Sequence, residues 1–272
     1  MPELPEVETT RRGLEPLLVG QRIRTVVVRN RRLRLPVPRR LPQLIAGATV
    51  RSLARRGKYL LVDCGAGTLI VHLGMSGRLW VVTNGAAPGP HDHFDLVLDN
   101  GVVVRLRDPR RFGLVLWQPG NPLAHVLLAK IGPEPLSAGF DGSALHAATR
   151  NRSAAIKQVL MDSHVVAGVG NIYANEALFR AGVSPRIAAR RLTRERCYVL
   201  AAKIRETLEL AIHAGGSSLR DYVASDGMAG SYQSQFLVYD RAGEPCQRCG
   251  ATIKESRLGQ RSTFYCPRCQ RG

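Results

Sequence analysis

Four cysteines near the C-terminus constrain the fold more than any other feature of this 272-residue sequence. Their spacing, Cys246-x2-Cys249-x16-Cys266-x2-Cys269, is typical of a zinc ribbon, in which four thiolates close the coordination sphere of one structural Zn²⁺. A segment this short cannot bury a sufficient core, so metal binding would supply its folding free energy. Two redox dithiols are the alternative, but neither pair follows the βαβ pattern of such motifs. We therefore expect one structural zinc ion.

The charge balance favours a polyanionic partner. Lys and Arg number 39 against 21 Asp and Glu, which gives a formal net charge of +18, and 34 of the 39 cations are Arg. Each cation beside a phosphate displaces a condensed counterion, and the planar guanidinium matches two phosphate oxygens at once. A well-solvated basic surface is the alternative. Cations also lie between the cysteine pairs, at Lys254, Arg257 and Arg261, so we expect a nucleic-acid partner.

The composition excludes several other classes of protein. Hydrophobic residues make up 44% and charged residues 22%, which rules out wholesale disorder. No apolar run approaches the length of a membrane span, and the acidic start MPELPEVE lacks the pattern of a signal peptide. Cys64 and Cys197 lie in apolar contexts that indicate core positions rather than ligands. We expect an intracellular protein.

Residues 1 to 130 combine a helical pattern with short β-branched runs. Apolar positions at helical spacing predict a helix that starts at Pro2 and ends near Gly20, and its stripe comprises Leu4, Val7, Leu14, Leu17 and Leu18. Asn100-Gly101 lies between two apolar runs and predicts a two-residue hairpin turn. Evenly spaced antiparallel strands favour a sandwich or a barrel.

The pattern changes after a stretch rich in Pro and Gly at 131–142, which we interpret as a linker. Helical periodicity then predicts helices around 155–160, 171–182 and 193–213. The expected domains are therefore 1–130, a helical domain at 143–235 and the cysteine module at 236–272. The predicted fold class is α+β.

Pro2 has chemistry of its own. Initiator methionine is readily removed before a small residue. The free secondary amine that results has a pKa of about 8, so a usable fraction of it is neutral at about pH 7. Such an amine can attack a sugar C1′ and form an iminium (Schiff-base) intermediate. Glu3 and Glu6 follow at helical spacing. The alternative is a proline in the first helical turn with acidic residues that complement the helix dipole.

Several motifs occur in one order along the chain. They are PELPEVE at 2–8, RRGKYLL at 55–61, HLGMSGRL at 72–79, HDHFDL at 91–96, DPRRFG at 108–113, AAIKQVLMD at 154–162, VVAGVGNIYANEALF at 165–179 and GQRSTFYC before the last cysteine pair. Each motif alone is weak, but their order and spacing are highly specific. Over essentially all of its length the sequence resembles the bacterial formamidopyrimidine-DNA glycosylases.

The resemblance implies a fold and an activity. The fold would be an N-terminal β-sandwich with a leading catalytic helix, a helix-two-turn-helix domain and a β-hairpin zinc finger. The activity would be base-excision repair: release of oxidised purines (8-oxoguanine and formamidopyrimidines) from double-stranded DNA, followed by β,δ-elimination of the strand. The enzyme would be a monomer in the bacterial cytoplasm, associated with the nucleoid.

The resemblance also assigns catalytic roles. Pro2 would be the nucleophile, Glu3 the general acid that opens the sugar ring, and Glu6 a supporting residue. Lys58 would assist near the lesion phosphate, where the alternative is a solvated basic strand end. Arg261 would act in the later elimination, where the alternative is a generic phosphate contact.

Further positions match the family's DNA contacts. Met75, Arg110 and Phe112 would fill the gap left by a flipped base, although Met75 and Phe112 could equally be core plugs. His91 and Arg152, with Arg110, match DNA-binding positions. A metal at His91 is discounted because no further ligand set accompanies it. The two remaining positions are Lys157, expected near the oxidised purine or else exposed to solvent, and Asn171, expected as a helix N-cap that also holds a phosphate.

Three alternative functions remain open at this point. A sister family that removes oxidised pyrimidines, similar to endonuclease VIII, shares the fold, but the PELPEVE start and Lys157 favour the purine enzyme. A non-catalytic DNA-binding protein is disfavoured because Pro2, Glu3, Lys58 and Arg261 are all present. A zinc-ribbon RNA-binding protein is the remotest of the three.

Overall fold

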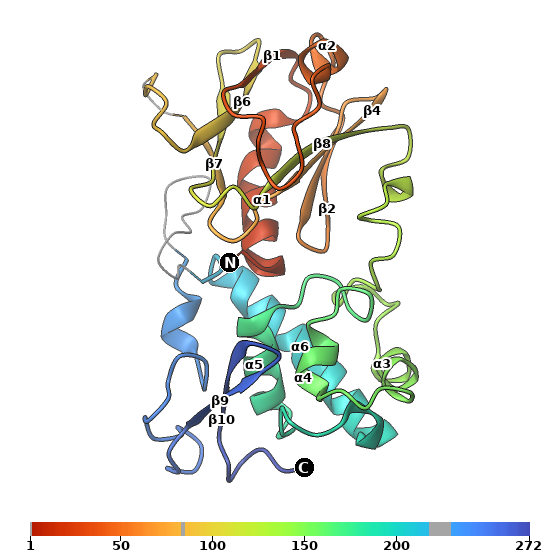
Figure 1. Cartoon of the computed structure of the whole chain (residues 1–272), viewed down its shortest axis with the longest axis vertical. Coiled ribbons are helices and arrows are strands. Elements are labelled where there is room, and N and C mark those ends of the chain that lie inside the picture. The colour runs from red at the N-terminus through yellow and green to blue at the C-terminus, as the bar shows by residue number, and fades with distance from the viewer. Residues whose placement is uncertain (1, 83–84, 218–229) are drawn as a thin grey trace. The chain divides into compact units, whose positions relative to one another are not determined.

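A computed structural model describes residues 2–82, 85–217 and 230–272, and Met1 lies outside these residues. The chain divides into two compact units (Figure 1), of which the first comprises Met1–Ala129 with Ala214–Ser231 and the second Lys130–His213 with Tyr232–Gly272. The helical and cysteine-containing segments, which the sequence assigns to separate domains, thus lie in one unit. The stretch 131–142 lies in that unit too.

The first unit is built from two four-stranded antiparallel sheets, as the spacing of strands in the sequence predicts. One sheet has the order β1 (Ile23–Val28), β6 (Asp92–Leu98), β7 (Val103–Arg107), β5 (Arg78–Val81). The other has the order β2 (Ser52–Arg56), β3 (Tyr59–Asp63), β4 (Gly67–His72), β8 (Leu114–Pro119). Together with the helices this confirms the α+β class.

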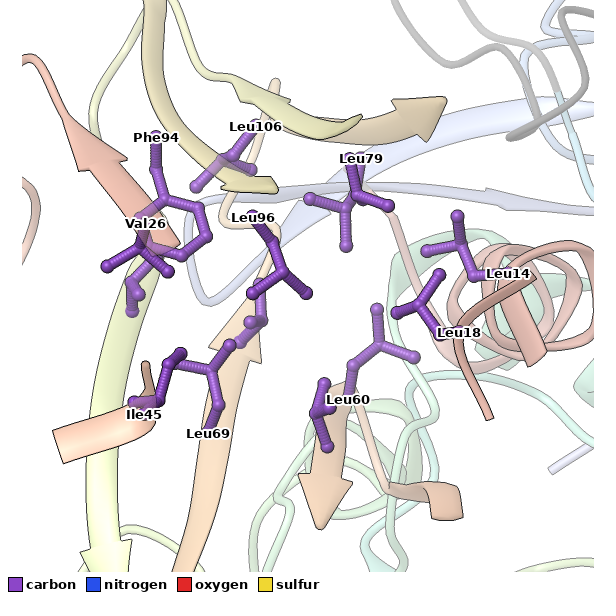
Figure 2. Packing of buried hydrophobic residues seen from close by; sticks show 14 of the residues in the cluster. Leu14, Leu18, Val26, Ile45, Leu60, Leu69, Leu79, Phe94, Leu96 and Leu106 are labelled. Carbon is purple, nitrogen blue, oxygen red and sulfur yellow. The ribbon is translucent and has the colours of Figure 1, made fainter. Parts of the chain in front are cut away.

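One apolar core joins these sheets to helix α1 (Leu4–Leu18) and to the short helix α2 (Leu41–Ile45). In Figure 2 the side chains of Leu14 and Leu18 point from α1 toward Leu60 and Leu79 of the strands. Each leucine buried in this way stabilises the fold by about 1.5–3 kcal/mol relative to an exposed one. Leu17 is 40% exposed and therefore does not belong to the buried face that the sequence predicted.

The start of α1 differs from the prediction in a way that matters for chemistry. Glu3 is the N-cap and Pro5 occupies the first turn, so Pro2 lies before the helix rather than in it. The helix ends at Leu18, and Gly20 follows the C-cap, as expected. A proline that only starts a helix does not explain Pro2, because Pro5 fills that position.

The hairpin between β6 and β7 is also longer than predicted. Gly101 N–H donates to the Leu98 carbonyl, and Leu98 N–H donates to the Val102 carbonyl, so the loop has three residues rather than two. Gly101 adopts a positive φ of 86° at the third position. A type I turn followed by a left-handed glycine gives this geometry, and an Asn-Gly pair fits it as well as the two-residue turn.

Four helices and one hairpin form the second unit: α3 (Gly142–Thr149), α4 (Ile156–Leu160), α5 (Asn171–Arg180), α6 (Arg194–His213), and strands β9 (Lys254–Leu258) and β10 (Arg261–Tyr265). The helices predicted around 155–160, 171–182 and 193–213 are confirmed. Helix α3 was not predicted, because Pro and Gly dominate the sequence before it. Asp141 caps α3 by accepting the Ala144 N–H at 2.8 Å.

Short 3₁₀ turns complete the described chain at Pro122–Ala124, Ala189–Arg191 and Tyr232–Gln235. Within 2–82, 85–217 and 230–272, no helix has the length and apolar character needed to span a bilayer.

The sandwich core makes a direct stability prediction. Leu106 is fully buried, so Leu106→Ala should lower the free energy of unfolding by about 2–5 kcal/mol through lost burial and the remaining cavity. Leu123→Ala is the matched control, because Leu123 is 49% exposed and should change the free energy by less than about 0.5 kcal/mol. Urea denaturation of both variants measures the difference, and equal midpoints would contradict the assigned core.

Candidate active site and nucleic-acid interface

The Glu6 carboxylate organises the N-terminal end of the first unit. Its Oε2 accepts the Glu3 N–H at 2.8 Å, and its Oε1 accepts both the N–H and the hydroxyl of Ser217, at 2.8 and 3.1 Å. Glu6 and Glu3 are each 1% exposed. The Glu3 N–H belongs to the peptide that joins Pro2 to Glu3, so Glu6 fixes the peptide unit attached to the predicted nucleophile.

Pro2 and Glu3 are adjacent and buried, which suits an amine and a carboxyl that act on one sugar. Because Pro2 lies outside the helix, its nitrogen takes no part in the helical hydrogen bonds. A free amine at this position can act as a nucleophile, and the neighbouring carboxyl can transfer a proton. The residue that must be removed to free the amine, Met1, is outside the described residues.

Lys58 lies in the turn between β2 and β3. The sequence had suggested a position within a strand. This turn is anchored to α1 through Arg55. Arg55 Nη1 donates to the Gly57 carbonyl at 3.0 Å, while its Nε donates to Glu8 Oε2 at 3.1 Å. The ion pair therefore couples the lysine turn to the helix that begins beside Pro2.

Glu8 is surrounded by cations. Arg11 and Arg12 also donate to its carboxylate, at 3.0 and 2.9 Å. Burial raises the pKa of Glu8, but these hydrogen bonds and the neighbouring positive charges, Arg55 among them, outweigh burial and hold the pKa below its ordinary value. Glu8 thus stays ionised at neutral pH, and the anchor of the lysine turn persists.

His72 lines a hollow of about 330 Å³ together with Arg34, Gly74, Met75 and Phe112. Burial, with the charges of Lys58 and Arg34, lowers the pKa of His72 to about 3, so its ring is neutral. Nδ1 accepts the Gly74 N–H at 2.9 Å, which leaves the proton on Nε2. Neither His72 nor Arg34 was predicted as a site residue, although His72 is the first residue of the HLGMSGRL motif. In the lining of this hollow, His72 is a neutral hydrogen-bond donor and Arg34 is a cation.

Met75, Arg110 and Phe112, predicted as a gap-filling set, lie on two loops that approach closely. Gly74 has a φ of +67°, and a Cβ there would lie 2.5 Å from Gly113 N, so this contact requires glycine. Phe112 is 44% exposed and Met75 is half-buried, which excludes core plugs. The Arg110 guanidinium lies 5.0 Å from the centre of the Phe112 ring. The set thus presents two apolar side chains and one cation at the surface.

Asp108 holds these loops together and was missed by sequence reasoning. Its Oδ1 accepts the Ser76 hydroxyl at 2.9 Å, and its Oδ2 accepts the Gly113 N–H at 2.7 Å. The Arg110 N–H in turn donates to the Ser76 hydroxyl at 3.3 Å. Asp108 is fully buried. Its place in the DPRRFG motif was the available signal, but only the fold reveals its partners.

His91 is exposed beside this loop, and its carbonyl accepts the Asp108 N–H at 3.0 Å. The neighbouring Asp92 is paired with Arg107 at 2.7 Å. The Asp92 carboxylate is thus engaged by an arginine of the adjacent strand β7. Among the residues that the structure describes, the one group of three or more ligands is the four-cysteine cluster.

The four cysteines fit zinc. Their sulfur atoms lie within 4.8 Å of one another, and the Cys246–Cys269 and Cys249–Cys266 sulfurs are 3.9 and 3.5 Å apart. A tetrahedral ion with Zn–S bonds of about 2.3 Å requires sulfur–sulfur separations of about 3.8 Å. The set therefore suits one structural zinc ion. Cys64 and Cys197 are buried elsewhere, which confirms that they are core residues.

Lys157 is 1% exposed, so the alternative of a solvent-exposed helix lysine is wrong. Its Nζ donates to the Ser262 carbonyl at 2.6 Å and to the Thr263 hydroxyl at 2.7 Å. Arg261, which directly precedes Ser262 in the chain, is exposed at the start of β10. Lys157 therefore fixes the strand that presents Arg261, and contact with an oxidised purine stays a prediction.

Helix α5 holds the cysteine module through two buried polar residues that sequence reasoning missed. Glu176 accepts the N–H groups of Leu237, Val238 and Tyr239, each at 2.9 Å. Asn175 Oδ1 accepts the Phe264 N–H at 2.9 Å. These bonds tie both the approach to the cysteine module and strand β10 to the helix.

Arg152 and Asn171, two predicted DNA contacts, also lie in the second unit. Arg152 pairs with Asp162 at 3.0 Å. Asn171 is the first residue of α5, and Gly170 is the N-cap, so the predicted N-cap position is off by one residue. Asn171 Oδ1 is buried without a hydrogen-bond partner in the described chain. An amide oxygen only accepts, so Oδ1 itself does not bind a phosphate, and the Nδ2 group is the part of this side chain that could donate to one.

The neutral state of His72 predicts a pH effect on stability. Unfolded His72 takes up a proton below about pH 6.5, whereas the folded side chain does so only near pH 3. Its contribution therefore lowers stability as the pH falls through this window. In His72→Asn, the loss of stability between pH 7.5 and 5.5 should be smaller than in the unchanged chain by about 1 kcal/mol. Urea titrations at both pH values measure this, and an identical loss would contradict the neutral assignment.

Comparison with known proteins agrees with this geometry. Three family models match: the Formamidopyrimidine-DNA glycosylase N-terminal domain at residues 1–115, the H2TH domain of the same enzymes at 131–223, and the zinc finger found in FPG and IleRS at 243–272. The formamidopyrimidine-DNA glycosylase of Stutzerimonas stutzeri (strain A1501) is 54% identical over 271 residues, with 100% of each chain covered.

Solved structures give the same result. The crystal structure of the MutM (Fpg) protein from Thermus thermophilus matches with a TM-score of 0.90 and 40% identity, and covers 99% of this chain and 98% of its own. The complex of Lactococcus lactis Fpg with DNA containing an abasic site matches with a TM-score of 0.91 and 36% identity, over 99% and 100%. With this agreement over its full length, the chain belongs to the formamidopyrimidine-DNA glycosylase family.

Proposed function

We propose that this protein is a base-excision repair enzyme that removes oxidised purines from double-stranded DNA and then cleaves the strand. The observation that carries the proposal is the buried Pro2–Glu3 pair, which lies before the helix and is fixed by Glu6. Family membership supplies the lesion class, 8-oxoguanine and formamidopyrimidines. The protein acts as a monomer in the bacterial cytoplasm, at the nucleoid.

The first step is attack of the neutral Pro2 nitrogen on C1′ of the damaged nucleotide. The new N–C1′ bond replaces the bond to the base, which leaves with that bond's electron pair. The attacking nitrogen gives up its proton and the departing base takes one up, so protons balance and the nitrogen lone pair is free again. Glu3 then protonates the ring oxygen, the C1′–O bond breaks, and an iminium forms between Pro2 and C1′. Glu6 contributes by holding the Pro2–Glu3 peptide, since a misplaced nucleophile reacts far more slowly.

Strand cleavage follows from the iminium. The positive nitrogen acidifies the C2′ proton, whose loss expels the 3′ phosphate in a β-elimination, and a second elimination releases the 5′ phosphate. Lys58, held by the Arg55–Glu8 pair, stabilises charge near the lesion phosphate. Arg261, held through Lys157, assists the later elimination.

Access to C1′ requires that the damaged nucleotide leave the base stack. Met75 and Phe112 then fill the vacated space as apolar wedges, and Arg110 faces the base on the opposite strand. His91, Arg152 and Asn171 bind backbone phosphates. The exposure of Phe112 and its contact with Arg110 support this assignment.

Borohydride trapping tests the proposal. The substrate is a duplex with one 8-oxoguanine opposite cytosine, and borohydride reduces the iminium to a stable amine. We expect a covalent adduct that maps to Pro2 on chains without Met1, as intact-mass analysis of the protein verifies. Pro2→Gly retains a free amine in a less constrained residue and should trap at least about tenfold more slowly, because orientation of the nucleophile is lost.

Other results of this experiment would contradict the proposal in distinct ways. Trapping on an oxidised pyrimidine but not on 8-oxoguanine would assign the lesion class to the sister family. Tight binding without any adduct, on protein shown to lack Met1, would leave a DNA-binding protein without catalysis.

A further inference from the structure

Two backbone segments of the second unit lie side by side and bring several arginines together. The N–H groups of Ala189 and Arg190 donate to the carbonyls of Ala154 and Arg152, at 2.9 and 3.0 Å. Ala155 and Ala188 form an antiparallel bridge. Residues 150–155 and 187–192 therefore run antiparallel, which places the segment of Arg150 and Arg152 next to that of Arg190 and Arg191.

We call the arginines of these two segments, together with Arg186 directly before the second one, the arginine ridge: Arg150, Arg152, Arg186, Arg190 and Arg191. All are exposed except the half-buried Arg152. Arg152 is paired with Asp162, whereas the other four form no ion pair with a carboxylate of residues 2–82, 85–217 or 230–272. Four neighbouring cations without an internal counterion attract an external anion.

Two neighbouring features extend the positive field. The Arg186 guanidinium lies 4.8 Å from the centre of the Tyr265 ring, so the ridge reaches strand β10 of the zinc-binding hairpin. Helix α6 begins directly after the ridge, where the Thr193 hydroxyl accepts the Arg196 N–H at 3.3 Å. The positive end of a 20-residue helix thus lies beside Arg190 and Arg191.

We propose that the arginine ridge binds phosphates of duplex DNA outside the lesion site, independently of sequence and damage. This inference rests on the proposed function, because it extends the DNA contact of the repair enzyme. The ridge contains no aromatic platform or buried acceptor that would read a base. Its role is to hold the enzyme on undamaged DNA during the search, and Arg190 and Arg191 contribute two phosphate contacts.

Salt dependence measures such contacts directly. The logarithm of the binding constant falls with the logarithm of salt concentration with a slope of about 0.9 for each neutralised phosphate. The double variant Arg190→Gln, Arg191→Gln should therefore reduce the magnitude of this slope by about 1.8 on undamaged duplex. Single-turnover excision at saturating enzyme should remain unchanged, since neither residue belongs to the catalytic machinery.

The matched control removes two arginines that already have an internal counterion. Arg22 and Arg24 are 66% and 56% exposed and lie near Asp99, at 3.8 and 3.6 Å. Arg22→Gln, Arg24→Gln changes the net charge equally but should leave the slope within about 0.5 of the unchanged protein. Fluorescence anisotropy with a labelled undamaged duplex from 50 to 200 mM salt (roughly the range over which such contacts are resolved) compares the full-length proteins.

An unchanged slope in the ridge variant, or equal slopes in ridge and control variants, would overturn the proposal. The charge-retaining pair Arg190→Lys, Arg191→Lys should restore most of the slope, and its failure to do so would indicate a structural effect instead. If the double variant does not fold, each single Gln variant should reduce the slope by about 0.9. Failure of the proposed function would give a different result. The ridge variant would still reduce the slope on undamaged DNA, but the unchanged protein would not excise oxidised purines.

Discussion

A single buried carboxylate, that of Glu6, connects the chemistry to the fold. Its two oxygens accept from the N–H next to Pro2 and from Ser217, which lies 211 positions further along the chain. A carboxylate is suited to this place because both of its oxygens are acceptors, whereas glutamine would direct an NH₂ group at one of the two donors. The position of the nucleophile therefore depends on the closure of the first unit, and the rest of the site is arranged around it.

The same principle recurs at three further segments. Glu8 holds the Lys58 turn through Arg55, Asp108 holds the loop of Phe112, and Glu176 holds the approach to the zinc module. Exposed side chains that would act on DNA come from turns, which are mobile unless their backbone is bonded. Buried carboxylates that accept N–H or guanidinium groups supply this rigidity without occupying the DNA-facing surface.

The sequence predicts those features that local patterns determine. Cysteine spacing identifies the zinc site, short β-branched runs identify the strands, and helical period locates α4, α5 and α6. Local patterns leave the three-residue loop at Gly101 undetermined, because Asn-Gly suits either loop length. They also fail for Lys157 and for the carboxylate anchors, since a partner 105 or 211 positions away is fixed only by tertiary packing. Without the family resemblance, Pro2 would have remained an ordinary helix-starting proline.

The role of Glu6 as the positioning residue for Pro2 can be measured most directly in Glu6→Gln. The rate of iminium formation under single turnover, followed by rapid quenching with borohydride on 8-oxoguanine duplex, should fall about 100-fold, because the nucleophile is no longer held in place. Affinity for a duplex with an uncleavable abasic analogue should change less than about threefold, since the DNA-binding surfaces are intact. Iminium formation at the rate of the unchanged protein, in a folded variant without Met1, would contradict the claim that this carboxylate positions the nucleophile.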